Sequence, residues 1–408
     1  MKHFRANLIA SISSIWLVST SVPTPTARGN DWAQWRGPNR DGISSETGWL
    51  STWPAEGPKK LWEGSVGIGY SSCAVSKGQV YTMGNVAEND NVLCFDEETG
   101  KLKWKHEYPC LSKDPNGYLG TRCTPTVDGE LVYSVSRQGN LFCLTASSGA
   151  VKWSKDFKKD FGSEAPQWGF AGSPLVEKDW VLVEVNGKAS VVAFNKLTGE
   201  VIWQAGGDAA GYASLIAFNL GQERCFLQFC SDHLICHKMK DGSEMWRFPW
   251  KTRYGVNAST PLIQGDEVFL STGYGYGCAL LKMSATGAQE VWRNKNMKNH
   301  VNSCVLLDGS IYGYDDNELK CLDWKTGETK WATRSYGKGS LISADGRLIL
   351  YGQSGKLGLA EATPVAFKEL CSFQAVEGKD TWANPALANG RLYVRSLDKL
   401  VALDVRKR

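Results

Sequence analysis

The sequence lacks the motifs of several common enzyme classes. It has no Gly-x-Ser-x-Gly element, so no nucleophile elbow is indicated, and no Cys-x-x-Cys-His element, so no attached c-type haem is indicated. Histidine is scarce, with five residues in 408. His233 and His237 are four residues apart in a segment typical of a strand, which would separate them by about 13 Å. One metal ion cannot bridge that distance, so we predict neither a metal site nor catalytic residues.

Charge and hydropathy exclude two further classes. The chain has 46 basic and 42 acidic residues, a net charge of +4, and no basic stripe of the kind that nucleic-acid binding needs. Residues 1–27 are predicted to be a signal peptide, because a short basic start precedes an apolar run and a small-residue processing region. An uncleaved anchor is the alternative. No later run is long and apolar enough to span a bilayer, so we expect a periplasmic or secreted protein.

Glycine and tryptophan are abundant, with 43 and 17 residues, and they recur at regular spacing. A pattern of alternating apolar residues, a turn ending in Gly and then a Trp is clearest at residues 319–331. Units of about 40–50 residues built of short strands are typical of β-propellers. We predict that the recurring Trp side chains pack between blades and that each indole N–H finds a carbonyl. These residues are Trp62, Trp104, Trp153, Trp203, Trp246, Trp292 and Trp331.

Each unit also has an upstream half that begins at a small polar residue, and there are eight such halves. They begin at Ser72, Thr124, Ser173, Ser214, Thr260, Ser303, Ser340 and Asn384. The seventh unit lacks the Trp, and the eighth ends without a closing strand after Leu403. The orphan strand around Trp62 can supply that strand and remove an exposed edge. We therefore predict an all-β, eight-bladed β-propeller with four-stranded blades, closed by N- and C-terminal strands, as a single domain over residues 31–405.

The twelve cysteines do not indicate a dense disulfide framework. Four of them occupy the same place in an apolar strand of successive units, where we expect buried thiols that pack as small hydrophobic groups. They are Cys94, Cys143, Cys236 and Cys321. Cys110 with Cys123, and Cys225 with Cys230, are left open as candidate disulfides.

A Thr-Gly-x-x-x-Trp element closes the units at residues 99–104, 198–203 and 326–331. It resembles the tryptophan-docking motif of PQQ-type, quinoprotein-like propellers, and the resemblance covers residues 31–404. This family includes quinoprotein dehydrogenases and BamB-type outer-membrane assembly factors, so the resemblance implies the fold and does not choose a function.

The dehydrogenase branch implies PQQ with Ca²⁺ or a lanthanide in an axial funnel, often beneath a disulfide between adjacent cysteines. Here no two cysteines are adjacent, and the one dense acidic cluster, residues 315–318, is typical of a hairpin turn. Size, blade number and the absence of inserted domains resemble the BamB-type branch more. No cysteine precedes Cys73, however, so no lipidated N-terminus is expected.

The axial mouth is the candidate binding site. Two residues before each small polar residue the aligned side chains vary, and large aromatic groups beside Arg and Lys are what a recognition surface uses. The Gly-rich residues 273–277 favour a wide hairpin over a binding loop. No carboxylate occurs at the aligned mouth positions, which favours an acidic ligand over a cation. The candidate ligand-binding residues are Tyr70, Arg122, Tyr212, Asn257, His300, Lys338 and Trp382.

From these patterns we predict a non-catalytic binding or scaffold propeller of the bacterial cell envelope. It would act as a monomer, without a cofactor, and engage an envelope protein, a peptide or an acidic ligand at the axial mouth. A PQQ-dependent oxidoreductase with bound PQQ and Ca²⁺ is the alternative. A hydrolase or lyase that uses the propeller as a frame is a third hypothesis.

Overall fold

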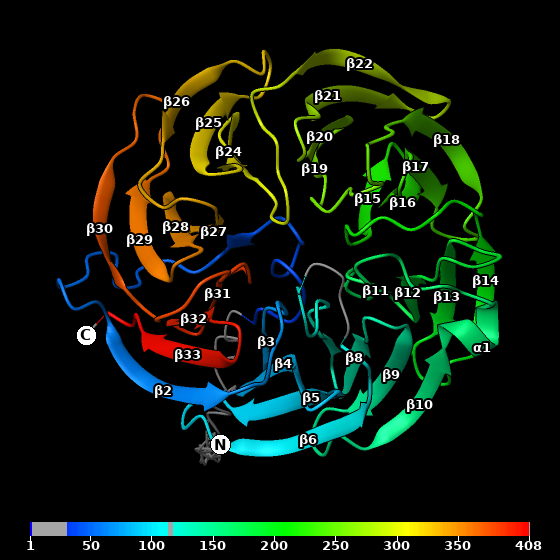
Figure 1. The fold of residues 1–408 in the computed structure, drawn as a ribbon, viewed down its shortest axis with the longest axis horizontal. Coiled ribbons are helices and arrows are strands. Elements are labelled where there is room, and N and C mark those ends of the chain that lie inside the picture. Colours follow the sequence, from blue (N-terminus) through cyan, green and yellow to red (C-terminus); the bar gives the residue numbers. More distant parts are fainter. Residues whose placement is uncertain (2–30, 113–116, 408) are drawn as a thin grey trace.

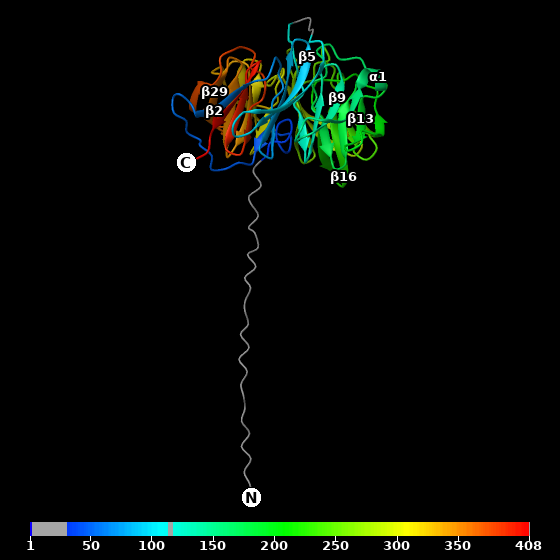
Figure 2. The same ribbon diagram turned by 90° about the horizontal axis from the view of Figure 1, so that it is seen from below.

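The computed structural model describes Met1 and residues 31–112 and 117–407, so the predicted signal peptide lies outside the described residues. Within them the chain forms 33 strands and one short helix, α1 (Phe157–Phe161). Eight sheets surround a central axis (Figure 1). Seen from the side they form a disc that is wider than it is tall (Figure 2). No helix in this part of the chain is long and apolar enough to cross a membrane. The predicted eight-bladed propeller is confirmed.

The blades follow one another along the chain. Blade 1 comprises β3 (Ala74–Ser76), β4 (Gln79–Val86), β5 (Asn89–Asp96) and β6 (Leu102–Pro109). Blade 2 comprises β7 (Thr126–Asp128), β8 (Leu131–Val135), β9 (Asn140–Thr145) and β10 (Val151–Asp156). Blade 3 comprises β11 (Leu175–Glu177), β12 (Trp180–Glu184), β13 (Val191–Asn195) and β14 (Val201–Ala205). Blade 4 comprises β15 (Ile216–Leu220), β16 (Glu223–Phe229), β17 (His233–Lys238) and β18 (Glu244–Pro249).

The second half of the ring repeats this plan. Blade 5 comprises β19 (Leu262–Gln264), β20 (Glu267–Thr272), β21 (Gly277–Ser284) and β22 (Gly287–Asn294). Blade 6 comprises β23 (Val305–Leu307), β24 (Ser310–Asp315), β25 (Glu318–Asp323) and β26 (Thr329–Thr333). Blade 7 comprises β27 (Gly339–Ala344), β28 (Arg347–Gly352), β29 (Lys356–Glu361) and β30 (Glu369–Gln374), with β1 (Ile43–Ser44) added along β27. Blade 8 comprises β31 (Ala386–Ala388), β32 (Arg391–Arg395), β33 (Lys399–Asp404) and β2 (Lys59–Ser65).

Blade 8 closes the ring with strands from both ends of the described chain. The N-terminal strand β2 pairs antiparallel with β33, and Trp62 faces Ala402 across the pair. The closing strand predicted around Trp62 is therefore confirmed. Because β2 covers the outer side of β33, the last strand of the chain is not left as an open edge.

Burial explains why the middle strands are so apolar. Nearly every residue of β4 and β5 is buried, because the neighbouring blades cover both faces of the sheet. The outer strands are mostly exposed and are buried at the recurring tryptophan, as at Trp62 in β2 and Trp104 in β6, where Tyr108 is buried as well. The sequence therefore alternates between continuous apolar runs and single buried aromatic residues.

Each of five tryptophans lies on the turn glycine of the next blade. Gly100 has φ 68°, and a Cβ there would come 2.4 Å from the Trp62 ring, so the turn requires glycine both for its backbone and for the contact. Trp104, Trp153, Trp203 and Trp292 lie against Gly149, Gly199, Gly242 and Gly327 in the same way. This is the physical basis of the repeated Gly-to-Trp spacing.

Most of the indole N–H groups bond to a carbonyl of the following blade. Trp62 donates to Glu97 at 2.9 Å, and Trp104 donates to Ala146 at 2.8 Å. Trp153, Trp292 and Trp331 make equivalent bonds of 2.8–3.0 Å. In Trp203 and Trp246 the buried indole nitrogen has no hydrogen-bond partner among the described residues.

The segment of residues 31–46, called the axial segment below, lies in the centre of the ring (dark blue in Figure 1). The sequence did not predict this position. Its Trp32 forms a β-bridge with Val75 of blade 1, and β1 pairs in parallel with β27, so blade 7 has five strands rather than the predicted four.

Two buried arginines attach the axial segment to the blades. Arg36 donates to the carbonyls of Ser303, at 3.2 Å, and Cys304. Arg40 donates to the carbonyls of Ser173, at 3.2 Å, Leu215, at 3.0 Å, and Pro174. Burial lowers the pKa of the two guanidinium groups to about 10 and about 9, so both remain charged at neutral pH. Their hydrogen bonds satisfy backbone carbonyl groups near the axis.

The ring of small polar residues joins the blades. The backbone N–H of Ser72 donates to the Thr124 hydroxyl at 3.1 Å, and that of Thr124 donates to Ser173 Oγ at 3.0 Å. Ser173 to Ser214 and Thr260 to Ser303 repeat the contact at 3.0 and 2.8 Å. All eight side chains are buried, and these contacts link successive blades; Ser214 also reaches the lining of the cavity described below.

All twelve cysteines are free thiols, and eleven of them are buried. Both candidate disulfides, Cys110 with Cys123 and Cys225 with Cys230, are therefore wrong. Cys225 Sγ lies 3.4 Å from Met245 Sδ, and Cys230 Sγ donates to the His233 carbonyl at 3.2 Å, so the two sulfurs face different neighbours. The four repeat-position cysteines lie in the middle strands and are fully buried.

Candidate functional site

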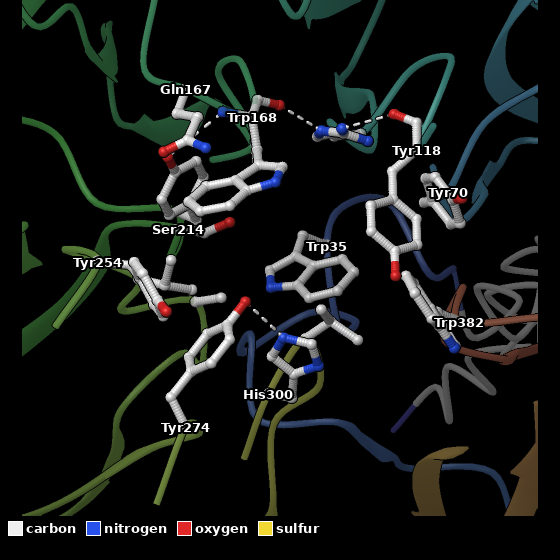
Figure 3. Close-up of a pocket in the computed structure, with 16 residues that line it drawn as sticks. Trp35, Tyr70, Tyr118, Gln167, Trp168, Ser214, Tyr254, Tyr274, His300 and Trp382 are labelled. Atoms are coloured by element: carbon white, nitrogen blue, oxygen red, sulfur yellow. Dashed lines mark hydrogen bonds between the residues drawn. The ribbon is translucent and has the colours of Figure 1, made fainter. Parts of the chain in front are cut away.

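The axial mouth contains a cavity of about 540 Å³ (Figure 3). Its walls come from the segments just before the innermost strand of seven blades, from loops between blades and from the axial segment. Eight of the sixteen lining residues are Trp or Tyr. The lining consists of Trp35, Tyr70, Tyr118, Arg122, Gln167, Trp168, Ala171, Tyr212, Ser214, Tyr254, Val256, Ala258, Tyr274, His300, Val301 and Trp382.

One wall is a stack of aromatic rings beside Arg122. Tyr70 stacks on Trp382 with ring centres 5.3 Å apart, and Tyr118 lies against the same indole, also at 5.3 Å. The Arg122 guanidinium lies 5.6 Å from the centre of the Tyr70 ring. It also donates to the backbone carbonyls of Trp168 and, at 2.8 Å, Tyr118. These contacts hold the arginine against the wall.

The facing wall is held by His300. Its Nε2 lies 2.8 Å from the Tyr274 hydroxyl, and its Nδ1 lies 2.8 Å from Lys338 Nζ. Burial and the Lys338 charge lower the pKa of His300 to about 4, so the imidazole is neutral at pH 7. Because Nδ1 accepts from the ammonium group, the ring proton lies on Nε2 and is donated to Tyr274. Tyr254 completes this wall, with its ring 5.2 Å from that of Tyr274.

Trp35 lies in the middle of the ring of labelled side chains in Figure 3. Its indole N–H donates to Thr260 Oγ1 at 3.1 Å. Thr260 follows the lining residue Ala258 in the sequence and lies closer to the innermost strand of blade 5. Since the axial segment continues into the centre of the ring, Trp35 forms the floor of the cavity. The cavity is therefore a cup that opens at one face of the disc.

Five of the seven predicted ligand-binding residues line the cavity: Tyr70, Arg122, Tyr212, His300 and Trp382. Asn257 is fully buried and donates to the backbone carbonyls of Cys230, at 2.7 Å, and Ser231, at 3.0 Å. Its predicted place in the lining is wrong, because the amide is used to hold a loop.

Lys338 does not line the cavity either. Its ammonium group lies behind His300, forms an ion pair with Asp316 at 3.2 Å, and lies 5.6 Å from the centre of the Trp382 ring. Its role is to support two lining side chains.

Sequence reasoning missed Trp35, Tyr118, Gln167, Trp168, Tyr254 and Tyr274 as lining residues. They lie in the axial segment and in loops, outside the repeated positions that the alignment could compare. Residues 273–277 do form a hairpin turn between β20 and β21, as predicted, but this turn also carries Tyr274 into the cavity. The concentration of tyrosine and tryptophan in the loops before the blades was the available signal.

The oxygen donors of the cavity do not fit a Ca²⁺–PQQ complex. Calcium takes six to eight oxygen ligands, among them carboxylates, and among the described residues none that lines the cavity is an aspartate or glutamate. The loop carboxylates of Asp208 and Glu164 also lie outside the lining. PQQ is itself a polycarboxylate, while the cations at this mouth are engaged, Lys338 by Asp316 and Arg122 by two backbone carbonyls.

A possible metal-ligand group occurs in blade 4, outside the cavity. Potential ligand atoms of Asp208, Cys230 and His233 lie within 4.8 Å of one another. Arg247 Nη1 already lies 3.2 Å from Asp208 Oδ1, and its positive charge opposes a second cation at this carboxylate. The absence of a metal site therefore stays a prediction.

The eight blades, the closing strand β2 and the tryptophans docked on turn glycines define a PQQ-like β-propeller. A family model described as outer membrane protein assembly factor BamB matches residues 88–333, more than half of the chain, so the chain belongs to this family. No curated protein matches the chain in sequence.

Solved structures share the fold at low sequence identity. BamB from Moraxella catarrhalis superposes with a TM-score of 0.61 at 13% identity, over 86% of this chain and 98% of that one. A europium-containing methanol dehydrogenase gives 0.66 at 12%, over 91% and 89% of the two chains. Quinohemoprotein alcohol dehydrogenase from Comamonas testosteroni also gives 0.66 at 12%, over 93% and 81%. At these identities the likeness concerns the fold alone.

Proposed function

We propose that this protein is a non-catalytic binding propeller of the bacterial cell envelope and that the axial cup is its recognition site. The observation that carries this proposal is the concentration of eight Trp and Tyr side chains around one cavity of about 540 Å³. Ligand pockets have this size and are mostly apolar with a few polar groups. Aromatic side chains supply most of the energy of recognition surfaces.

The proposed envelope location rests on the predicted signal peptide and on the family, which is described as outer membrane protein assembly factor BamB. We propose a protein, a peptide or another envelope component as the partner, a monomeric chain, and no cofactor. The charges modify the expectation of an acidic ligand. His300 is neutral and Lys338 is paired with Asp316, which favours an uncharged group in the cup.

Site-specific photocrosslinking in living cells tests the proposal. A benzophenone amino acid replaces Tyr254, whose side chain at the mouth is 46% exposed, and in a matched control it replaces Val365, which is 85% exposed between β29 and β30. We expect a discrete crosslinked product from position 254 that position 365 does not give. The same products from both positions, or none from 254, would count against a recognition site at the cup.

A PQQ-dependent oxidoreductase is the second candidate, because methanol and alcohol dehydrogenases share the fold. The test is an absorbance titration of the purified chain with PQQ and Ca²⁺, followed by a dye-linked assay with alcohols and sugars. We expect no saturable binding and no oxidation, since none of the described lining residues offers a carboxylate to the cation. Binding at micromolar PQQ would favour the enzyme over the scaffold.

A further inference from the structure

The shape of the cup restricts what can enter it. The axial segment closes the lower end, with Trp35 as the floor and the buried Arg36 and Arg40 behind it. A proline-rich or extended peptide lies along a groove that is open at both ends, and strand addition needs an unpaired sheet edge. A blind cup instead accepts a compact group or the end of a chain.

The lining also restricts the charge of the ligand. A cationic ligand would face Arg122 beside Tyr70, and Lys338 lies behind the lining beside Trp382, so two of the aromatic rings already have a positive neighbour. An anionic ligand would have to compete with Asp316 for Lys338. Among the described lining residues there is no carboxylate, and His300 is neutral, so a charged ligand would exchange water for a mostly aromatic surface, and an uncharged ligand has the smallest desolvation cost.

The accessible chemistry consists of aromatic rings with hydroxyl and amide groups between them. Tyr254 and Tyr274 are 46% and 49% exposed, and Trp35 is partly exposed at the floor. Ser214 and Gln167 supply a hydroxyl and an amide in the same lining. An uncharged ligand that matches this set needs flat apolar faces and a rim of hydrogen-bonding groups.

We propose that the cup binds the end of a neutral, β-linked oligosaccharide, with the terminal sugar ring on Trp35. In a β-linked glucose or N-acetylglucosamine ring the substituents are equatorial, so both faces present C–H bonds to aromatic rings. The hydroxyl and acetamido groups point outward to the Ser214, Gln167 and tyrosine groups of the wall. This inference rests on the proposed function, because it names the ligand class of the same recognition site.

Calorimetric titration of the full chain with cellotetraose and with chitotetraose tests the proposal, together with the change in tryptophan fluorescence. We expect saturable binding of at least one of them and a weakening of about tenfold or more in Trp35→Ala and Tyr254→Ala, as for central aromatic contacts. Tyr254→Phe keeps the ring and should bind more tightly than Tyr254→Ala, and Val365→Ala, an exposed position outside the lining, is the control expected to bind like the natural chain. Tyr254 is at the exposed rim, so its substitution should leave the melting temperature unchanged even if Trp35→Ala destabilises the axial segment.

The outcomes separate this inference from the proposed function. If neither sugar binds, or if Tyr254→Ala binds as tightly as the natural chain, the saccharide inference is wrong. If a crosslink from position 254 still forms in that case, the cup recognises a partner of another class and only the saccharide inference falls. If there is neither sugar binding nor crosslinking, both proposals fall.

Discussion

Replacing Trp62 by alanine tests the closure of the ring most directly. Within β2, Trp62 is the one fully buried side chain, at 7% exposure. Its ring stacks on Phe95 at 6.1 Å, lies 5.9 Å from Tyr393 and covers the turn at Gly100. Trp62→Ala therefore removes the buried side-chain contacts of the closing strand with both blade 8 and blade 1, while its backbone pairing with β33 remains.

The magnitude follows from burial of the whole indole. Truncation of a buried Trp to Ala costs about 3–5 kcal/mol, and the indole N–H bond to Glu97 at 2.9 Å is lost as well. With an unfolding entropy of about 2 cal/mol/K per residue over a domain of this length, a loss of about 4 kcal/mol lowers the Tm by roughly 5 °C. Trp62→Phe keeps ring contact with the turn and should lose less than half as much.

Thermal unfolding followed by circular dichroism, with hydrogen exchange on the folded state, provides the measurement. Trp153→Ala is the matched control, because Trp153 makes the same kind of bond, to the Lys196 carbonyl at 3.0 Å. That bond joins blades 2 and 3, which follow one another directly in the chain. Both variants should lose stability, but only Trp62→Ala should accelerate exchange in β2 and β33. A Tm within about 1 °C of the natural chain, or unchanged protection of β33, would refute the reasoning.

Three other predictions concern the ends, the thiols and pH. Deletion of residues 31–63 removes both β2 and the axial segment, so the purified variant should lack a cooperative melting transition; a transition like that of the natural chain would show that closure is dispensable. Under native conditions a thiol reagent should modify the partly exposed Cys371 first. The repeat-position thiols should stay unmodified, because burial raises the pKa of each one; they are Cys94, Cys143, Cys236 and Cys321. The pKa of His300 is about 4 in the fold and about 6.5 in an unfolded chain, so the unfolded state binds more protons between these values and stability should fall as pH is lowered through that window. His300→Gln should remove this part of the pH dependence of urea unfolding, and an identical pH profile would contradict the assignment.

The sequence by itself determined the blade count, the closing strand and the structural role of the repeated glycines and tryptophans. These features could be predicted because they depend on contacts that recur once per unit. A Trp that must lie on the turn glycine of the next blade leaves the same spacing at Gly100, Gly149 and Gly199. The orphan strand around Trp62 was recognisable for the same reason, since the eighth unit lacked its outer strand.

Only the tertiary structure decided the floor and most of the walls of the cup. Trp35 lies far from Thr260 in the sequence, and no repeat predicts that the axial segment enters the ring and bonds to several blades through Arg36 and Arg40. Position alone also could not separate a lining residue from a supporting one. Asn257 and His300 lie at similar places before their blades. The Asn257 amide donates to backbone carbonyls, whereas the His300 side chain lines the cavity. The physical reason is that blade packing repeats along the chain, whereas the cup is built once, from non-repeated loops whose neighbours are set by closure of the ring.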